Sequence, residues 1–453
     1  MNELVFSYEG RILMYLHGNS RIDHNGHLEI GGCSTVQLAE QYGTPLYIYD
    51  ESLIESKCRE FHEALKETGL KYQVAYASKA FLCIEQARLI EREGFCLDVV
   101  SSGELYTAIQ AGFPPEKIHF HGNNKSIEEI EEALDAKIGC FVVDNFFELE
   151  VLQAIAEGRG EYVSILLRVT PGVEAHTHEY VMTGQEDSKF GFDITSGQAN
   201  EAVAISLDSP NLKLLGIHSH IGSQIFEPDG FVHAIKILMN FLSELKNELD
   251  YTAEILNVGG GFGIRYTSED EPLSIIKHID QITSIIKQQC EELSYPVPEL
   301  WLEPGRSIVG EAGTTLYTIG ATKKLPSVRK YVSVDGGMTD NIRPALYGSK
   351  YEAMLANRAN DENKEVVSIA GKCCESGDML IWDCELPVVE SNDLLAVSCT
   401  GAYGYSMANN YNRIRRPAVV FVKDGVSRVV VQRETYQDLI KNDMIYIENS
   451  SIR

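Results

Sequence analysis

The sequence has few positive charges, no run of basic residues and no long apolar run. It carries 39 lysines and arginines against 66 aspartates and glutamates, which gives a formal net charge of −27. A chain this acidic, without a basic patch, is poorly suited to binding the phosphate backbone of a nucleic acid. No apolar stretch approaches the roughly 18 residues that a membrane-spanning helix needs. We therefore expect no nucleic-acid partner and no membrane-embedded segment.

The sequence also lacks the cysteine patterns that mark disulfide frameworks and zinc sites. Its ten cysteines are scattered, apart from the adjacent pair Cys373 and Cys374, and no CxxC motif or Cys/His cluster occurs. Structural zinc sites need clustered ligands at characteristic spacings. The first residues do not show the pattern of a secretory signal peptide. We therefore expect free thiols, no metal site and a reducing, cytoplasmic setting.

Short apolar runs of strand length alternate with amphipathic helical stretches between residues 72 and 305. The eight runs are YQVAYASK (72–79), FCLDVVS (95–101), KIHFHG (117–122), CFVVDN (140–145), VSILLRV (163–169), LLGIHSHIG (214–222), ILNVGG (255–260) and PELWLEPG (298–305). Eight strand–helix units in this length fit a parallel (β/α)8 barrel of about 250 residues. Such barrels place their chemistry at the C-terminal ends of the strands. Here these ends carry Lys79, Asp98, His121, Asp144, Arg168, His220, the glycines 259 to 261, Glu303 and Arg306.

The chain of 453 residues is too long for one domain of ordinary size, and its pattern changes after the eighth run. Closely spaced strand-like runs follow, with a hairpin signal at residues 423–425, and short strand candidates also lie at residues 28–49. We therefore predict an α/β protein with a TIM-like barrel over residues 49–306. A second, all-β domain would combine residues 307–453 with strands from residues 1–48. The segment from 171 to 213 has a length typical of a lid or substrate loop.

Four features of the predicted barrel mouth suit pyridoxal phosphate, although each has an ordinary structural explanation when taken alone. Lys79 could form a Schiff base with the cofactor, or be a surface or salt-bridged lysine. The glycines 259 to 261 could bring backbone N–H groups to a phosphate, or form a turn. Glu303 could keep a pyridine nitrogen protonated, or form a structural ion pair. His220 could stack on the ring, or be a barrel histidine. Their combination at one barrel mouth favours the cofactor.

Longer motifs make the sequence similar to a known family. They are YASKA around Lys79, LDVVSSGEL (97–105), HFHGNNKS (119–126), GIHSHIGSQI (216–225), NVGGGFGI (257–264), EPGRSIV (303–309), VDGGMTDNIRPALY (334–347), CESGDML (374–380) and GAYGYSMANNYN (401–412). From about residue 16 to residue 439, the sequence resembles the pyridoxal-phosphate decarboxylases of the alanine-racemase-type barrel fold. Within that family the similarity is to the branch that converts meso-2,6-diaminopimelate to L-lysine and carbon dioxide, the last step of lysine biosynthesis.

The resemblance implies a role for each residue that matches a family motif. Lys79 would be the Schiff-base lysine, His220 would stack on the ring, and Glu303 would contact the pyridine nitrogen. The other implied cofactor residues, some of them behind the direct contacts, are Asp98, Arg168, Ser223, Gly259, Gly260, Gly261, Gly305, Arg306 and Tyr403. The residues implied for the substrate are Arg306, Arg343, Tyr347, Glu375 and Tyr403. Arginines suit the distal carboxylate of the substrate because a guanidinium group can bind it through two parallel hydrogen bonds.

The resemblance also implies a catalytic cysteine and a homodimer with shared active sites. Cys374 would join Lys79 and His220 as a catalytic residue by donating a proton, and it would reach a site formed with the partner subunit. Its neighbour Cys373 departs from many relatives, and we expect it to be a packing residue. Two alternatives remain open: decarboxylation of another amino acid, such as D-ornithine, D-lysine or a carrier-bound glutamate, and a catalytically silent homologue.

Overall fold

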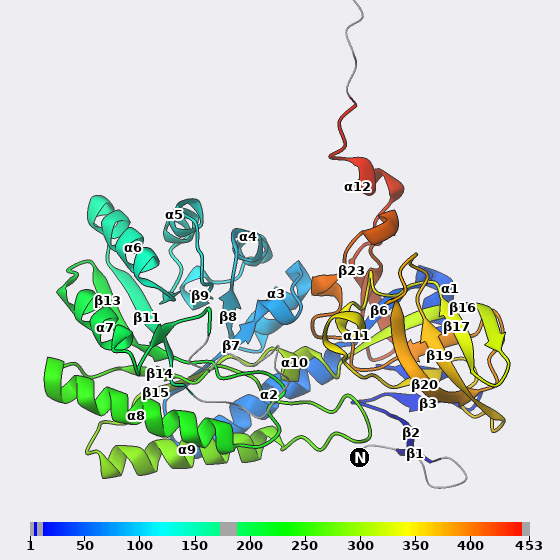
Figure 1. The fold of residues 1–453 in the computed structure, drawn as a ribbon, viewed down its shortest axis with the longest axis horizontal. Helices are drawn as coiled ribbons and strands as arrows, with labels where there is room; N and C mark the ends of the chain where they lie inside the picture. Colours follow the sequence, from blue (N-terminus) through cyan, green and yellow to red (C-terminus); the bar gives the residue numbers. More distant parts are fainter. Residues whose placement is uncertain (1–3, 7–11, 173–187, 446–453) are drawn as a thin grey trace, which may run out of the picture.

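The computed structural model describes residues 4–6, 12–172 and 188–445. The chain forms two lobes that lie side by side, one a barrel of strands and helices and the other made mostly of antiparallel strands (Figure 1). The last helix, α12 (Tyr436–Ile440), stands away from the body of the second lobe. None of the described helices is long and apolar enough to cross a membrane.

Eight parallel strands close the barrel, which confirms the predicted fold class. They are β7 (Tyr72–Ala77), β8 (Cys96–Val99), β9 (Ile118–Phe120), β10 (Cys140–Val143), β11 (Val163–Thr170), β13 (Leu212–His218), β14 (Ile255–Asn257) and β15 (Glu299–Leu302). Each strand pairs with the next, and β15 returns to pair with β7. The surrounding helices are α2 (Glu51–Thr68), α3 (Ile84–Arg92), α4 (Ser102–Ala111), α5 (Ile127–Ala136), α6 (Phe146–Arg159), α7 (Gln198–Asp208), α8 (Asp229–Leu249) and α9 (Ile275–Glu292).

Both faces of the barrel strands are buried, which explains why they read as short apolar runs in the sequence. In β10, Cys140 and Val142 lie in a small apolar cluster with Trp301 of β15. Phe141 and Val143, which alternate with them along the strand, belong instead to the large core that includes the helices. This alternation fixes which side chain of each strand end points toward the mouth.

The second lobe is built on a sheet whose strands come from both ends of the chain. Its order is β20, β19, β17, β16, β6, β22, β23, with β21 and β18 attached through β16. The strands are β6 (Leu46–Asp50), β16 (Gly313–Leu325), β17 (Arg329–Val334), β18 (Ala353–Leu355), β19 (Lys364–Ala370), β20 (Met379–Pro387), β21 (Leu394–Val397), β22 (Ala418–Lys423) and β23 (Val426–Val431). The predicted hairpin is present between β22 and β23, and its turn residues Asp424 and Gly425 have φ of 50° and 78°, as a type I′ turn requires.

The N-terminal strand candidates divide between two sheets. β6 lies inside the large sheet, where it pairs with β16 and β22. β4 (Leu28–Ile30) pairs instead with β3 (Arg21–Ile22) and β5 (Cys33–Ser34), and α1 (Thr35–Tyr42), which the sequence pattern did not reveal, follows them. The two sheets still share an apolar cluster, in which Leu28 and Ile30 lie together with Ile48 of β6.

The segment after β11 is shorter than the sequence suggested. Helix α7 and the strand β12 (Phe192–Asp193), which extends the sheet beside β11, belong to the barrel. The expected insertion from 171 to 213 therefore ends before α7, because residues 198–208 form an ordinary barrel helix. Residues 173–187, which belong to the predicted lid or substrate loop, lie outside the described residues.

Contacts between the lobes hold a loop of the second lobe against the barrel mouth. Tyr49 of β6 stacks on Phe81, with ring centroids 4.5 Å apart, and its hydroxyl donates to the carbonyl of Gly401 at 2.7 Å. The backbone N–H of Tyr403 donates to the carbonyl of Ala80 at 2.8 Å. Because Ala80 directly follows Lys79, these bonds place Tyr403 beside the lysine.

A buried histidine on the outer side of the barrel is expected to make the fold sensitive to acid. His278 of α9 packs against Phe231 and Phe262, is fully buried, and has no hydrogen-bond partner for either ring nitrogen in the described chain. Burial lowers its pKa from 6.5 to about 4. The folded state therefore favours the neutral ring. The contribution of His278 to the free energy of unfolding is fully present above pH 6.5 and is lost progressively as the pH falls from 6.5 toward 4.

We expect His278→Leu, which keeps an apolar side chain of similar size, to lose less stability than the parent between pH 7 and pH 4. The difference should be up to about 3 kcal/mol in the free energy of unfolding, the energy equivalent of the pKa shift. Urea titrations at several pH values measure it. His24→Leu, at an exposed position, is the matched control, and equal pH dependence in both variants would contradict the role of His278.

Candidate active site

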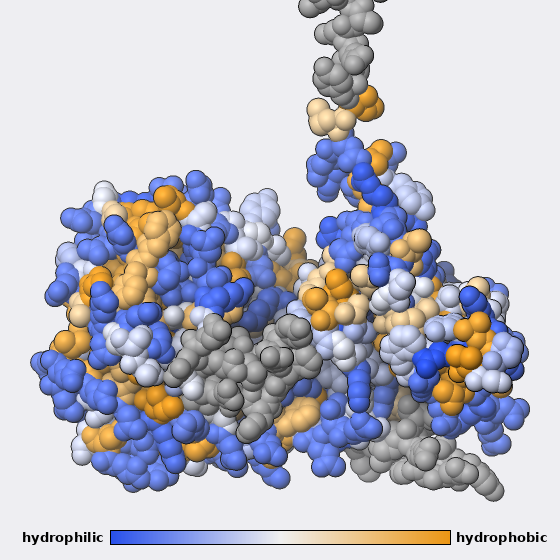
Figure 2. Space-filling model, in the orientation of Figure 1, coloured by the Kyte–Doolittle hydropathy of each residue, from blue (hydrophilic) through white to orange (hydrophobic). Residues whose placement is uncertain are grey.

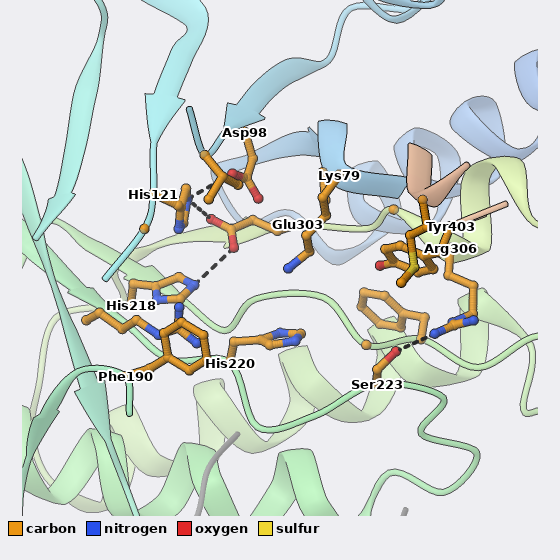
Figure 3. A pocket seen from close by; sticks show the side chains of 18 of the residues that line it. Lys79, Asp98, His121, Phe190, His218, His220, Ser223, Glu303, Arg306 and Tyr403 are labelled. Carbon is orange, nitrogen blue, oxygen red and sulfur yellow. Dashed lines mark hydrogen bonds and ion pairs between the residues drawn. The ribbon is translucent and has the colours of Figure 1, made fainter. Parts of the chain in front are cut away.

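A cavity of about 440 Å³ opens at the mouth of the barrel, where the C-terminal ends of the strands meet the second lobe. This volume is in the range of small-molecule binding sites. The predicted site residues that line it are Lys79, Asp98, Arg168, His220, Ser223, Gly261, Glu303, Gly305, Arg306, Arg343, Tyr347 and Tyr403. Figure 3 shows the amino group of Lys79 between Glu303 on one side and Tyr403 with Arg306 on the other.

Lys79 lies just beyond β7, in the short helical turn η1 (Ser78–Ala80). Its neighbours Ser78 and Ala80 are buried, whereas Lys79 is exposed to the cavity. The turn is held by the N–H of Ala77, which donates to the carbonyl of Pro304 at 3.1 Å at the end of β15. The lysine is therefore presented to the cavity on a rigid support, close to Glu303 in the fold.

Glu303 is buried among polar side chains from three other strand ends of the barrel. His218 at the end of β13 forms a 3.0 Å hydrogen bond with one carboxylate oxygen. The other oxygen lies 3.0 Å from Nε2 of His121, beyond β9, and accepts a 2.6 Å hydrogen bond from the amide of Asn257 in β14. The dashed contacts around Glu303 can be followed in Figure 3. The sequence placed His121 at a strand end without a role, and it did not single out His218 or Asn257.

The surroundings of Glu303 and Asp98 push their pKa values in opposite directions. Burial would raise the pKa of Glu303, but attraction to His121 and His218 outweighs it and holds that pKa well below its usual range. Burial raises the pKa of Asp98 to about 7, and nearby Glu303 adds to this effect. Two carboxyl groups whose pKa values differ in this way take different protonation states near neutral pH. Glu303 is the one that stays ionised.

His220 lies below Lys79 and is kept neutral. Burial lowers its pKa well below the usual value, and the positive charges of Lys79 and Arg168 lower it further. Its Nδ1 accepts a 3.3 Å hydrogen bond from the backbone N–H of Gly260. A neutral ring in the cavity wall suits stacking on another aromatic ring better than a charged one would.

The three glycines after β14 have no room for side chains. A Cβ atom at Gly260 would lie 2.0 Å from the carbonyl oxygen of Glu303, and one at Gly261 would lie 2.3 Å from that of Gly222. At Gly259 it would lie 2.8 Å from the His220 ring. Gly261 lines the cavity, whereas Gly259 and Gly260 hold the surrounding loops together. The glycine loop thus leaves its backbone open to a ligand, as a phosphate site requires.

Two buried arginines line the cavity beside Tyr403, which lies on the side of Lys79 away from Glu303 (Figure 3). Arg306 and Arg343 are 6% and 7% exposed, and within the described chain neither forms an ion pair with a carboxylate. Arg306 donates to Ser223 Oγ at 2.9 Å, and both guanidinium groups lie over the ring of Tyr403, at 4.9 and 5.4 Å from its centroid. Arg343 also lies over Tyr347, at 5.3 Å. Buried guanidinium groups without a carboxylate partner suit an anionic ligand.

Arg168 closes the cavity on the Glu303 side together with a residue that the sequence did not reveal. Its guanidinium lies 4.2 Å from the ring centroid of Phe190, and its Nε lies 3.8 Å from Asp144 Oδ1. Phe190 also lines the cavity. A lone aromatic residue after a long loop carries no sequence signal of its own, which explains why it was missed.

Cys374 and Glu375 do not line the cavity formed by the described residues of this one chain. Both are exposed, on a loop between β19 and β20 of the second lobe. The N–H of Cys374 donates to Asn412 Oδ1 at 2.8 Å, which orders the backbone of this loop. Their neighbour Cys373 is half-buried, and burial raises the pKa of its thiol to about 12.

Comparison with known proteins identifies the family. The family described as "Pyridoxal-dependent decarboxylase, pyridoxal binding domain" matches residues 51–310. Diaminopimelate decarboxylase of Bacillus subtilis (strain 168) is 58% identical over 431 residues, which cover 95% of this chain and 98% of the relative. The chain belongs to the diaminopimelate decarboxylases. The family predicted from the motifs is confirmed, and with it the requirement for pyridoxal phosphate.

Solved structures agree with this membership. The structure of diaminopimelate decarboxylase from M. jannaschii in co-complex with L-lysine has a TM-score of 0.89 and 38% identity, and covers 94% of this chain and 98% of its own. Diaminopimelate decarboxylase of Staphylococcus aureus (strain COL) is 50% identical over 424 residues, covering 93% of this chain and 99% of the relative. The lysine/ornithine decarboxylase of Vibrio vulnificus, at 22% identity and a TM-score of 0.70, shares the fold.

If this diaminopimelate decarboxylase attaches its cofactor through Lys79, Lys79→Ala should lose the visible absorbance of the bound cofactor, while the cofactor-free variant and the cofactor-free parent unfold at the same temperature. The fold should survive because the Lys79 side chain is exposed to the cavity. Borohydride reduction followed by peptide mapping should label Lys79 in the parent protein. A label on a different lysine would contradict the assignment.

Proposed function

We propose that this chain decarboxylates meso-2,6-diaminopimelate to L-lysine and carbon dioxide, the last step of lysine biosynthesis. The observation that carries the proposal is the pair of buried arginines, Arg306 and Arg343, which have no carboxylate partner in the described chain and share one cavity with Lys79. A substrate with a second carboxylate supplies the missing negative charge. A simple amine-forming decarboxylase would not need two such groups.

The polar groups of the cavity fit pyridoxal phosphate in one orientation. Lys79 would hold the cofactor's aldehyde carbon, Glu303 would pair with the protonated pyridine nitrogen, and His220 would cover one ring face. The phosphate would lie at the glycine end, with the loop 259–261 and Ser223. Pyridoxal phosphate, when bound, supplies a ring that accepts the electron pair left behind as carbon dioxide departs. Glu303 favours this because it stays ionised in the described structure.

The remaining residues would place the substrate. Arg343, which lies over the rings of Tyr347 and Tyr403, can bind the distal carboxylate together with Tyr347. Arg306 also lies over Tyr403, on the side of Lys79 away from Glu303 (Figure 3). Glu375 would pair with the distal amino group. With the distal end held, the bond to the reacting carboxylate can be fixed perpendicular to the ring, and this orientation selects which bond breaks.

We further propose a homodimer in which Cys374 and Glu375 complete the site of the second copy. Both are exposed in the single chain, although Cys374 is the expected proton donor. Apolar side chains near the C-terminus are also uncovered: Tyr436, Ile440 and Met444 are 69%, 53% and 92% exposed. Side chains of this kind on an ordered segment are typical of a surface that another chain covers. The cytoplasmic setting stays a prediction, for which the ten unpaired cysteines are the support.

The function is tested by supplying the purified protein and pyridoxal phosphate with candidate substrates. We expect meso-2,6-diaminopimelate to give L-lysine and carbon dioxide in equal amounts. D-Lysine and D-ornithine lack the second carboxylate and should lose a charge-assisted contact worth roughly 1.5–3 kcal/mol, or about ten- to a hundredfold in kcat/KM. Chiral chromatography and carbon dioxide release measure both. Higher kcat/KM for D-lysine, D-ornithine or carrier-bound glutamate would overturn the substrate assignment.

The shared site is tested by mixing two inactive variants. Lys79→Ala and Cys374→Ala should each be nearly inactive, yet subunit exchange should restore one intact site in each mixed dimer, because the two-fold axis makes both sites equivalent. Random pairing predicts recovery of up to about a quarter of the parent activity. Native mass spectrometry of tagged subunits confirms the exchange. Inactive mixed dimers would show that Cys374 does not serve the partner's lysine.

A further inference from the structure

A lysine and a glutamate form a completely buried ion pair just behind the cavity. Lys125 Nζ lies 2.6 Å from Glu148 Oε1, and the two side chains are each 1% exposed. The ammonium group also donates to the backbone carbonyls of Gly122 and Val142, both at 2.9 Å. All three of its N–H donors are therefore used. Neither residue lines the cavity.

The pair joins the two loops that follow β9 and β10. Lys125 and Gly122 belong to the loop after β9, whereas Val142 belongs to β10 and Glu148 to the first turn of α6. The second oxygen of Glu148 accepts a 2.9 Å hydrogen bond from the backbone N–H of Asp144. The ion pair is thus the centre of a small network that fixes one strand end against the next.

Each loop in this network carries a side chain of the active site. Gly122 directly follows His121, whose Nε2 lies 3.0 Å from Glu303. Asp144 lies 3.8 Å from Arg168, which closes the same side of the cavity. A second contact joins the same two loops: Asn145 Nδ2 donates a 3.0 Å hydrogen bond to the carbonyl of Asn123. The loop after β9 is short, so a change at Gly122 is passed directly to His121.

We propose that Lys125 is a positioning residue, which together with Glu148 holds His121 against Glu303. Without the ammonium group, two buried carbonyls and one buried carboxylate would lose their donor, and buried polar groups in that state move toward other partners. Movement of Gly122 would draw His121 away from the carboxylate. Glu303 would then lose one of the two imidazoles that keep it ionised and oriented.

The consequence rests on the proposed function, in which Glu303 pairs with the pyridine nitrogen of the cofactor. A misplaced His121 should weaken cofactor binding and lower kcat, because both depend on Glu303. It should leave KM for the substrate nearly unchanged, since Arg343 lies over Tyr347 and Tyr403, and Tyr403 is on the other side of Lys79 from Glu303 (Figure 3). A residue that only stabilises the fold would not separate kcat from KM in this way.

The test uses the double variant Lys125→Met/Glu148→Leu, which removes both charges and replaces them with apolar side chains of similar size. Such replacements of a buried ion pair often preserve folding. The matched control is Lys330→Met/Glu365→Leu in the second lobe, where the lysine and glutamate also lie 2.6 Å apart and the glutamate also accepts a backbone N–H. Cofactor affinity by fluorescence titration, kcat and KM are measured for both variants.

We expect the Lys125/Glu148 variant to lose about tenfold in cofactor affinity and in kcat, with KM changed by less than about twofold, while the control matches the parent. His121→Asn should cause a similar loss. If Lys125 acts through His121, combining the two changes should add nothing further, because coupled residues are not additive. Independent, multiplying losses would overturn the proposal, as would a Lys125/Glu148 variant that behaves like the control.

The variant Glu303→Gln separates this proposal from the proposed function. If Glu303→Gln retains full cofactor affinity and kcat, the role of Glu303 at the pyridine nitrogen is wrong. If Glu303→Gln is impaired but the Lys125/Glu148 variant is not, the positioning role alone is wrong. Should the Lys125/Glu148 variant fail to fold, Glu148→Gln, which keeps an oxygen acceptor for Lys125, is measured against Glu365→Gln. An additive effect of Glu148→Gln with His121→Asn, or none, would again overturn the proposal.

Discussion

A buried carboxylate at the barrel mouth determines how the polar groups around it are arranged. Glu303 would be costly to ionise in an apolar interior, and the imidazoles of His121 and His218 with the amide of Asn257 remove that cost. His121 follows β9, whereas His218 and Asn257 lie on β13 and β14, which are not neighbours of β9, so these partners meet at one mouth only when the barrel is closed. The charge state of the site therefore depends on the completed fold.

The opposite end of the cavity has the reverse polarity. Arg306 and Arg343 place two positive charges over Tyr403, and Lys79 lies between Glu303 and the pair Tyr403 and Arg306 (Figure 3). A molecule with a cationic ring nitrogen at one end and anionic groups at the other matches this layout. On the face shown in Figure 2, hydrophilic residues predominate and the apolar ones are scattered in small groups, so this face shows no comparable separation of charge. Orientation is decided inside the cavity.

The sequence predicted the barrel and placed several polar residues at its mouth, because strand ends in a parallel barrel converge there. Lys79, His220, Glu303 and Arg306 could be found in this way, and all four line the cavity. The residues that hold these four side chains in place could not be found from the sequence. His218 reads as one more polar residue in an apolar run, and its importance arises from pairing across strands that are 85 residues apart along the chain. Helix α1 was missed because it is short, and only Thr35 and Leu38 of its eight residues are buried, which leaves little periodicity in the sequence.

The position of β6 has a consequence for the order in which the protein can fold during synthesis. This strand is made early, yet it pairs on one side with residues 313–316 and on the other with residues 418–422. A ribosome must therefore complete the whole barrel before the first partner of β6 emerges, and nearly the whole chain before the second does. Until then β6 has two open edges, the condition in which strands pair wrongly with other chains. The second lobe consequently cannot complete its sheet until residues 418–422 have emerged, whereas the barrel can form while synthesis continues.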